Sequence, residues 1–207
     1  YMQKKALIHI KNLSYSYGSI VLFRDISFDV FLGGLYLISG PSGVWKTTLL
    51  SLIGGINSPE NGVIEYDSVL SPRERWFGYA FIDGPFFETI SVRENIFLLE
   101  NFSGVKIDRE YYRELLKYFE IEFLESTPLI SLSAWQRERV NCIRAHIHKP
   151  KVIILDEPGS NLDNHLFEKI LSFFEKNIQQ NHTSYVIVSH DTRFTQMATK
   201  HIELIPQ

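Results

Sequence analysis

Hydrophobic and polar residues alternate over the first part of the chain and then give way to short continuous hydrophobic runs. The alternation over residues 6–30 predicts two half-buried strands, Ala6–Ile10 and Ile26–Val30, with a turn at Tyr17–Ser19 between them. The continuous runs predict strands that are buried on both faces. The further predicted strands are Leu35–Ile38, Val63–Tyr66, Phe77–Ile82, Val152–Leu155, Tyr185–Val188 and His201–Ile205.

Hydrophobic residues at helical spacing lie between these strands. The predicted helices are Lys46–Ile53, Val92–Leu99, Arg109–Phe119, Ala134–His148 and Asn164–Asn177, with Ser133 as the N-cap of the fourth. Strands that alternate with helices indicate a mostly parallel sheet, which binds its ligand at the carboxyl ends of the strands. Three of the helices follow one another without a strand between them, so we expect a helical insertion.

Composition and charge exclude several classes of protein. The 207 residues carry a net charge of −3, which gives no electrostatic case for nucleic acid as the main partner. The single cysteine, Cys142, excludes an internal disulfide framework and fits a reducing compartment. No hydrophobic run approaches the ~20 residues that a membrane-spanning helix needs. We therefore expect a cytoplasmic protein.

A glycine-rich turn follows the run Leu35–Ile38 and leads into a predicted helix. Gly40, Gly43, Lys46 and Thr47 stand at the spacing of a phosphate-binding P-loop, in the strand–loop–helix context that this loop requires. Backbone N–H groups at a helix start hold anionic phosphate, while the lysine adds a positive charge at the outer phosphates and the threonine hydroxyl ligates Mg²⁺. The turn therefore predicts a nucleoside triphosphate site.

One position of this loop departs from the pattern. Trp45 stands directly before the lysine, where the motif has a glycine. Its indole brings bulk into the space that a glycine leaves for the phosphates, and such strain costs ~1–3 kcal/mol. A cost of this size lowers the affinity for the nucleotide roughly ten- to hundredfold. The sequence thus predicts a P-loop fold with weakened or lost nucleotide binding.

Polar residues also follow two other predicted strands. Asp156 and Glu157 come directly after the run Val152–Leu155, and His190 follows the run Tyr185–Val188. Carboxylates lifted out of the core at such a point can support Mg²⁺ and polarise an attacking water. Taken alone, an Asp-Glu pair after a strand is more often a solvated strand end than a metal or catalytic site.

Further motifs frame the acidic pair. Leu132–Val140 lies upstream, Pro158–Asp163 lies downstream, and Ser189–Asp191 follows one strand later. With the loop at Gly40–Thr48, this order of motifs resembles the ATP-binding-cassette (ABC) ATPase family, the nucleotide-binding subunits of ABC transporters. The resemblance covers nearly the whole chain.

The resemblance implies a fold of the α/β class. This fold has a P-loop NTPase core, an N-terminal antiparallel β-subdomain and an inserted helical subdomain at about residues 86–148. Residues 1–207 would form a single ABC-type ATP-binding domain. It also implies ATP and Mg²⁺ as cofactors.

The resemblance assigns roles to individual residues. Tyr17 would stack on adenine, Ser133 would be the signature serine, and the loop that grips the phosphates would consist of Gly40, Pro41, Ser42, Gly43, Val44, Trp45, Lys46, Thr47 and Thr48. Thr47 and Asp156 would hold Mg²⁺. The catalytic residues would be Glu157 as the base, His190 as the switch histidine and Lys46.

The resemblance also implies partners. In this family two subunits enclose two ATP molecules, so we expect a second cassette subunit in a homodimer or heterodimer. We further expect a transmembrane permease subunit and a peripheral position on the cytoplasmic face of the membrane through that partner. Leu132–Ala134 and the chain length are similar to small haem-exporter-type ATPases, whereas Leu52–Ile56 is similar to lipoprotein-release and macrolide-export types.

Three departures from the family pattern leave the activity open. Trp45 replaces a glycine of the P-loop, and Ala134-Trp135 stands where the signature has two glycines. Ile82 stands where a glutamine would ligate Mg²⁺ and sense the membrane subunit. One hypothesis is a working ATPase that has been altered at two sites, and the other is natural degeneracy.

The functional alternatives follow from these departures. The main prediction is the ATP-hydrolysing subunit of an ABC transporter. The second is a non-catalytic cassette that dimerises or scaffolds a membrane complex, and the third is a cassette protein of DNA repair or translation. Among the remaining residues, we expect Cys142 in the core and Arg137 and Arg139 on a solvated helix face. Phe86 and Phe87 would either line a docking groove or be buried.

Overall fold

The chain folds into two sheets and a group of helices, seen in a computed structural model that describes residues 6–41, 45–68, 70, 77–81, 84, 86–104, 106–160 and 162–204. The strands are β1 (Ala6–Tyr17), β2 (Ile20–Phe31), β3 (Leu35–Ser39), β4 (Asn61–Tyr66), β5 (Phe77–Ala80), β6 (Val152–Asp156), β7 (Ser184–Val188) and β8 (Lys200–Glu203). The helices are α1 (Trp45–Ile53), α2 (Val92–Ser103), α3 (Arg109–Tyr118), α4 (Ala134–His146), α5 (Asn164–Asn181) and α6 (Arg193–Met197), with short 3-10 turns at Glu122–Leu124 and Leu129–Ser131.

The N-terminal strands form an antiparallel sheet in the order β2-β1-β4. The central strand β1 pairs on both sides, so that Ile10 lies opposite Phe28 of β2 and Ile64 of β4. This confirms the expected N-terminal antiparallel β-subdomain. The predicted strands were too short, because the hairpin continues through polar residues to Tyr17 and resumes at Ile20.

The second sheet is parallel throughout, in the order β5-β6-β7-β3-β8. Every residue of β6 and β7 is buried, as the continuous hydrophobic runs predicted. In the register, Ile187 of β7 pairs with Leu37 of β3 on one side and Leu155 of β6 on the other. The carboxyl ends of these three strands therefore meet at one edge of the sheet.

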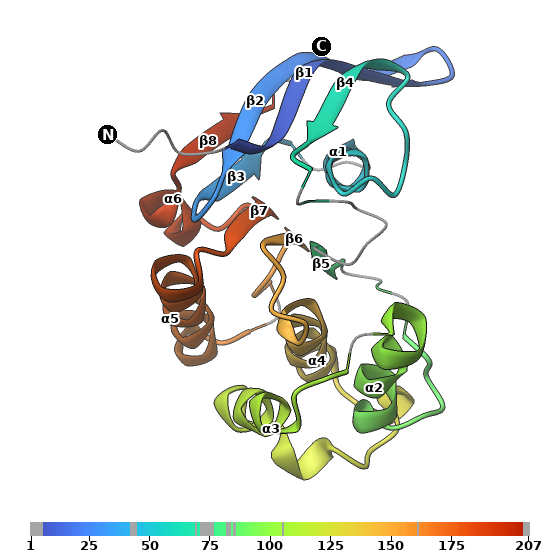
Figure 1. Ribbon diagram of the computed structural model, residues 1–207, viewed down its shortest axis with the longest axis vertical. Helices are drawn as coiled ribbons and strands as arrows, with labels where there is room; N and C mark the ends of the chain where they lie inside the picture. Colours follow the sequence, from blue (N-terminus) through green and yellow to red (C-terminus); the bar gives the residue numbers. More distant parts are fainter. Residues whose placement is uncertain are drawn as a thin grey trace.

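Helices α2, α3 and α4 come between β5 and β6, and Figure 1 shows them grouped at the end of the molecule opposite the antiparallel sheet. Two of them begin with a capping box, formed by Ser91 with Glu94 and by Ser133 with Gln136. The prediction that Ser133 is an N-cap is thus confirmed. Among the described residues, none of the helices is both long and apolar enough to cross a membrane.

The buried side chains form two core groups, one beneath the helices and one beneath the antiparallel sheet. Cys142 lies in the first group, as expected. The expectation of a solvated face at Arg139 was wrong, because only 5 % of this residue is exposed. Its guanidinium donates hydrogen bonds to the carbonyl oxygens of Phe119 and Glu120, at 2.9 and 3.3 Å, where α3 ends. These bonds attach α4 to α3.

Candidate active site

Three chain segments converge at the carboxyl edge of the parallel sheet. The connection from β3 leads into α1, β6 ends at Asp156, and β7 runs into the segment with His190. Asp156 pairs directly with Val188 in the strand register. Residues that are more than a hundred positions apart in sequence are thereby brought together.

Lys46 is the centre of this convergence. Although it is charged, only 5 % of the residue is exposed. Its Nζ donates a hydrogen bond of 3.1 Å to the carbonyl oxygen of Gly40, and it also contacts Nε2 of His190. Oε1 of Glu157 lies 3.6 Å from the Lys46 Nζ and 3.5 Å from the His190 Nε2. An ammonium, an imidazole and a carboxylate thus share one small space.

Thr47 and Asp156 form a second pair beside this group. The Thr47 hydroxyl donates a hydrogen bond of 2.6 Å to Oδ2 of Asp156, which is 8 % exposed. A hydroxyl and a carboxylate oxygen are hard donors of the kind that Mg²⁺ prefers, and this ion keeps several water and phosphate ligands in addition. The described residues hold no cluster of three or more His, Cys, Asp or Glu that would form an all-protein metal site. The pair therefore fits Mg²⁺ bound together with a phosphate.

The turn that carries Glu157 has an unusual backbone. Glu157 has a φ of +47°, in the left-handed region that costs a non-glycine residue about 1 kcal/mol or more. Its N–H donates to the carbonyl of Val188 at 2.8 Å, and its Oε2 accepts a bond of 3.2 Å from the N–H of His190. The carboxylate is therefore attached to the end of β7 as well as to β6.

The indole of Trp45 folds against the core. The residue begins α1 and packs against the core group beneath the antiparallel sheet. A Cβ added to Gly40 would lie 2.8 Å from the indole Cη2 and 2.6 Å from the Leu204 carbonyl, so the ring covers this glycine closely. Of the remaining predicted loop residues, Pro41 is exposed and Thr48 half-buried, while Ser42, Gly43 and Val44 lie outside the described residues. Ile82 also lies outside them.

Two predicted site residues lie on other elements. Tyr17 ends β1 on the antiparallel sheet and is 76 % exposed. Ser133 caps α4, and its side chain accepts a bond from the Gln136 N–H at 3.4 Å. Trp135, in the first turn of the same helix, is 38 % exposed and lies under the Arg139 guanidinium at 4.2 Å from the ring centroid.

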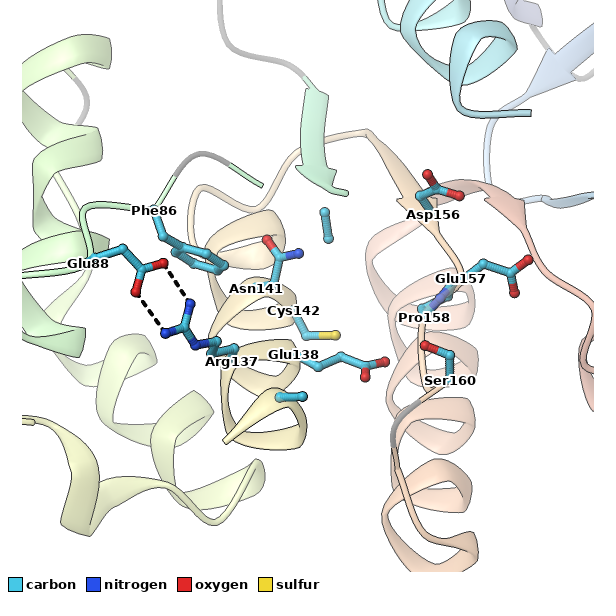
Figure 2. A pocket seen from close by; sticks show the side chains of 12 residues that line it. Phe86, Glu88, Arg137, Glu138, Asn141, Cys142, Asp156, Glu157, Pro158 and Ser160 are labelled. Atoms are coloured by element: carbon cyan, nitrogen blue, oxygen red, sulfur yellow. Dashed lines mark hydrogen bonds and ion pairs between the residues drawn. The ribbon is translucent and has the colours of Figure 1, made fainter. Parts of the chain in front are cut away.

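A cavity of about 360 Å³ adjoins the acidic pair, and Figure 2 shows the side chains that line it. Arg137 extends from α4 to one side, where both of its terminal nitrogens donate to Glu88 at 2.6 and 2.7 Å. Glu138 extends to the other side, toward Pro158 and Ser160. We expected Arg137 on a solvated helix face, but its guanidinium is half-buried and paired with Glu88.

The sequence reasoning missed Glu88, Glu138 and Asn141 as residues around the site. A signal for the last two exists in the helix pattern. Ala134, Glu138 and Asn141 follow one another at spacings of four and three, so they share one face of α4. That face is more polar than a helix face packed on a core, which favours a site.

Comparison with known proteins agrees with this geometry. The family model described as ABC transporter matches residues 23–160. A lipoprotein-releasing system ATP-binding protein, LolD, of Bacteroides fragilis is 28 % identical over 96 % of this chain and 98 % of its own length. The sulfate/thiosulfate import ATP-binding protein CysA of Thermosynechococcus vestitus is 34 % identical over 89 % of this chain, which spans only 56 % of that relative.

Two solved structures have the same fold. The dimeric structure of a bacterial ABC transporter cassette is 25 % identical with a TM-score of 0.85, covering 97 % of this chain and 95 % of that one. The dimeric post-hydrolysis state of an ATP-binding cassette with ADP and Pi is 26 % identical, also with a TM-score of 0.85, covering 96 % and 94 %. The family model covers two thirds of the sequence, and the structure brings Lys46, Asp156 and Glu157 together as that family requires. The chain therefore belongs to the ABC transporter family, as an ATP-binding subunit of the ATPase type.

Proposed function

We propose that this chain binds Mg·ATP at the carboxyl ends of β3, β6 and β7 and hydrolyses the bond to its terminal phosphate. The observation that carries the proposal is the meeting of Lys46, Glu157 and His190. Three different segments supply them, and the Glu157 carboxylate lies 3.6 Å from the ammonium and 3.5 Å from the imidazole. Such a group of charges is costly to assemble unless it serves a charged ligand.

Lys46 would hold the outer phosphates. Its ammonium is removed from water and is already directed by the Gly40 carbonyl, so little conformational freedom is lost when an anion binds. The start of α1 adds the partial positive charge of its free backbone N–H groups. Together they account for binding of a phosphate group at this edge of the sheet.

Thr47 and Asp156 would hold the magnesium ion. Bound there with the nucleotide, Mg²⁺ would neutralise the charge that develops on the phosphate oxygens. The 2.6 Å hydrogen bond between Thr47 and Asp156 already places both oxygen donors side by side. Little rearrangement of this chain is therefore needed for the pair to act as ligands.

Glu157 would be the general base. Its backbone N–H and one carboxylate oxygen are attached to the end of β7, which directs the other oxygen toward Lys46 and His190. A water placed next to this oxygen would give its proton to Glu157 as it attacks the terminal phosphorus. His190, whose backbone N–H orients the carboxylate, would contact the same phosphate through Nε2.

The chain would act in a larger assembly. We propose that Ser133 and the first turn of α4 face a second cassette subunit, because similar cassettes have been solved as dimers. The relatives named as import or lipoprotein-releasing ATP-binding proteins support a transmembrane permease as a further partner. On this proposal residues 1–207 form a single cassette, with Tyr17 against the adenine, at the cytoplasmic face of the membrane.

Phosphate release from Mg·ATP by the purified chain tests the proposal. The wild type should turn over ATP, and Glu157→Gln should lower kcat by at least about a hundredfold, because general bases contribute roughly 10²–10⁴-fold. Glu175→Gln, an exposed glutamate of α5, is the matched control and should leave kcat unchanged. Equal turnover by the Glu157→Gln variant would contradict the assignment. A wild type that binds ATP without turnover would instead favour the non-catalytic cassette.

A further inference from the structure

The turn after β6 is held in a conformation that its own residues do not favour. Glu157 has a φ of +47°, and Gly159 two residues later has a φ of +88°. Within the turn, the Ser160 N–H donates to the Glu157 carbonyl over 3.3 Å, at the long end of hydrogen-bond distances. A left-handed glutamate persists only where its surroundings determine the backbone. Contacts from outside the turn must therefore fix it.

Glu138 of α4 provides such a contact. Its Oε1 accepts a hydrogen bond from the N–H of Gly159, which is a buried residue. A buried backbone N–H needs a partner, and a bond to a charged acceptor is stronger than one to a neutral acceptor. The carboxylate of Glu138 thus satisfies a group of the turn that carries the proposed base.

Phe167 of α5 is a second contact of the turn. A Cβ at Gly159 would overlap with the Phe167 ring, so this glycine packs directly against the ring, and it also donates to the Glu138 carboxylate. The ring is itself buried, with its neighbour Leu166 also packed in the core. The turn is therefore in direct contact with both α4 and α5.

Glu138 also connects two parts of the site. It belongs to the helix that Ser133 caps, and α4 is anchored in the core through Val140 and Ile143. Its neighbour Arg137 extends to the opposite side of the cavity and holds Glu88, as Figure 2 shows. A displacement of α4 would consequently move the acceptor of the Gly159 N–H.

We propose that Glu138 is a positioning residue, which fixes the turn 157–160 through the Gly159 N–H and so maintains the direction that the contacts with β7 give to the Glu157 carboxylate. The inference rests on the proposed function of Glu157 as the base. It gives α4 a direct connection to the site of hydrolysis within one subunit. On this proposal Glu138 acts through the turn.

Two variants distinguish the effect of losing the hydrogen-bond acceptor of Glu138 from the effect of changing the size of its side chain. Glu138→Met keeps the length of the side chain but removes the acceptor, whereas Glu138→Gln keeps a carbonyl oxygen that can accept the same bond. We expect Glu138→Met to lower kcat roughly 10- to 100-fold, the range that a misplaced catalytic group causes. The KM for ATP should change less than about twofold, and Glu138→Gln should restore most of kcat. Glu175→Met is the control for an exposed glutamate.

Amide hydrogen exchange at Gly159 tests the hydrogen bond without reference to activity. In Glu138→Met, this amide should exchange at least about tenfold faster than in the wild type and in Glu138→Gln. The reason is that an amide without a hydrogen bond exchanges without waiting for the structure around it to open. If Glu138→Met leaves the exchange of this amide unchanged, the inference is wrong. The same holds if Glu138→Met leaves kcat unchanged while Glu157→Gln is inactive, and in both cases the proposed function still stands. If Glu157→Gln retains full turnover, the proposed function fails as well. An equal loss of kcat in Glu138→Met and Glu175→Met would also contradict the inference.

Discussion

The helices α1 and α4 both carry a tryptophan in their first two positions, but their surroundings differ. Trp45 at the start of α1 packs on the core and covers Gly40, and the next residue, Lys46, is almost completely buried. Trp135 at the start of α4 is 38 % exposed, and its main contact is the guanidinium of Arg139. The buried residues of α4 come later in the helix, from Arg139 to His146 at its other end.

Both tryptophans stand where the family pattern has a glycine, and we expect them to act differently at a half-buried and at an exposed helix start. A ring that packs on the core contributes to folding even where it crowds a ligand. An exposed ring contributes little to folding and remains available to a neighbouring molecule. We therefore expect Trp45 to affect stability and ATP affinity together, and Trp135 to affect the assembly of two subunits.

The largest predicted effect concerns the buried end of α4. Burial lowers the pKa of His146 to about 4, although its bond to the Cys142 carbonyl acts in the opposite direction. The neutral ring also lies 3.0 Å from the Tyr185 hydroxyl. In the unfolded chain His146 has its ordinary pKa near 6.5, so it binds a proton there at a pH at which the folded protein keeps it neutral. The free energy of unfolding should therefore fall by about 3 kcal/mol as the pH falls from 6.5 to 4.

Urea unfolding at pH 7 and pH 4.5 measures this effect. The His146→Leu variant should show a distinctly smaller difference between the two pH values, since its position no longer binds a proton in the unfolded chain. A pH dependence identical to that of the wild type would mean that groups other than His146 cause the loss of stability.

Next in size is the replacement of the half-buried Trp45. Trp45→Gly should raise the affinity for Mg·ATP roughly tenfold to hundredfold by removing the ring that crowds the loop. It should also lower the free energy of unfolding by about 1–3 kcal/mol, because a half-buried ring is lost. Titration calorimetry and urea unfolding measure the two changes, with Trp45→Phe as the control that keeps aromatic packing. An unchanged affinity would show that the indole lies clear of the phosphates.

The smallest predicted effect on stability belongs to the exposed tryptophan. Trp135→Gly should change the free energy of unfolding by only about 1 kcal/mol, which corresponds to one cation–π contact and the cost of a glycine in a helix. Its effect should appear in turnover, which should rise with protein concentration more steeply than in the wild type. If turnover is unaltered at every concentration, Trp135 lies outside the interface between subunits.

Much of the fold follows from the hydrophobic pattern alone. The runs over Leu35–Ile38, Val152–Leu155 and Tyr185–Val188 predicted the three strands that carry the site, and the observed strands differ by one residue at an end. The ends of the helices were predicted less accurately than the strands. The helix predicted as Asn164–Asn177 continues to Asn181, because it ends only where His182 adopts a left-handed conformation.

The contacts between elements could not be predicted in this way. The burial of Arg139 depends on carbonyl groups at the end of α3, which no pattern within α4 reveals. The bond between Glu138 and the Gly159 N–H likewise depends on the conformation of a turn on another segment. The convergence of Lys46, Glu157 and His190 was expected only because their motifs resemble those of a known family.

Calorimetric titration of Mg·ATP into the wild type and the Lys46→Met variant tests the central claim most directly. Methionine is unbranched, apolar and similar in length to this buried side chain without its ammonium, so the variant removes the charge. A hydrogen bond to a charged group is worth about 1.5–3 kcal/mol, so the account predicts that the variant binds ATP at least about tenfold more weakly. Equal binding by the two proteins would contradict the claim that this group of residues holds the triphosphate.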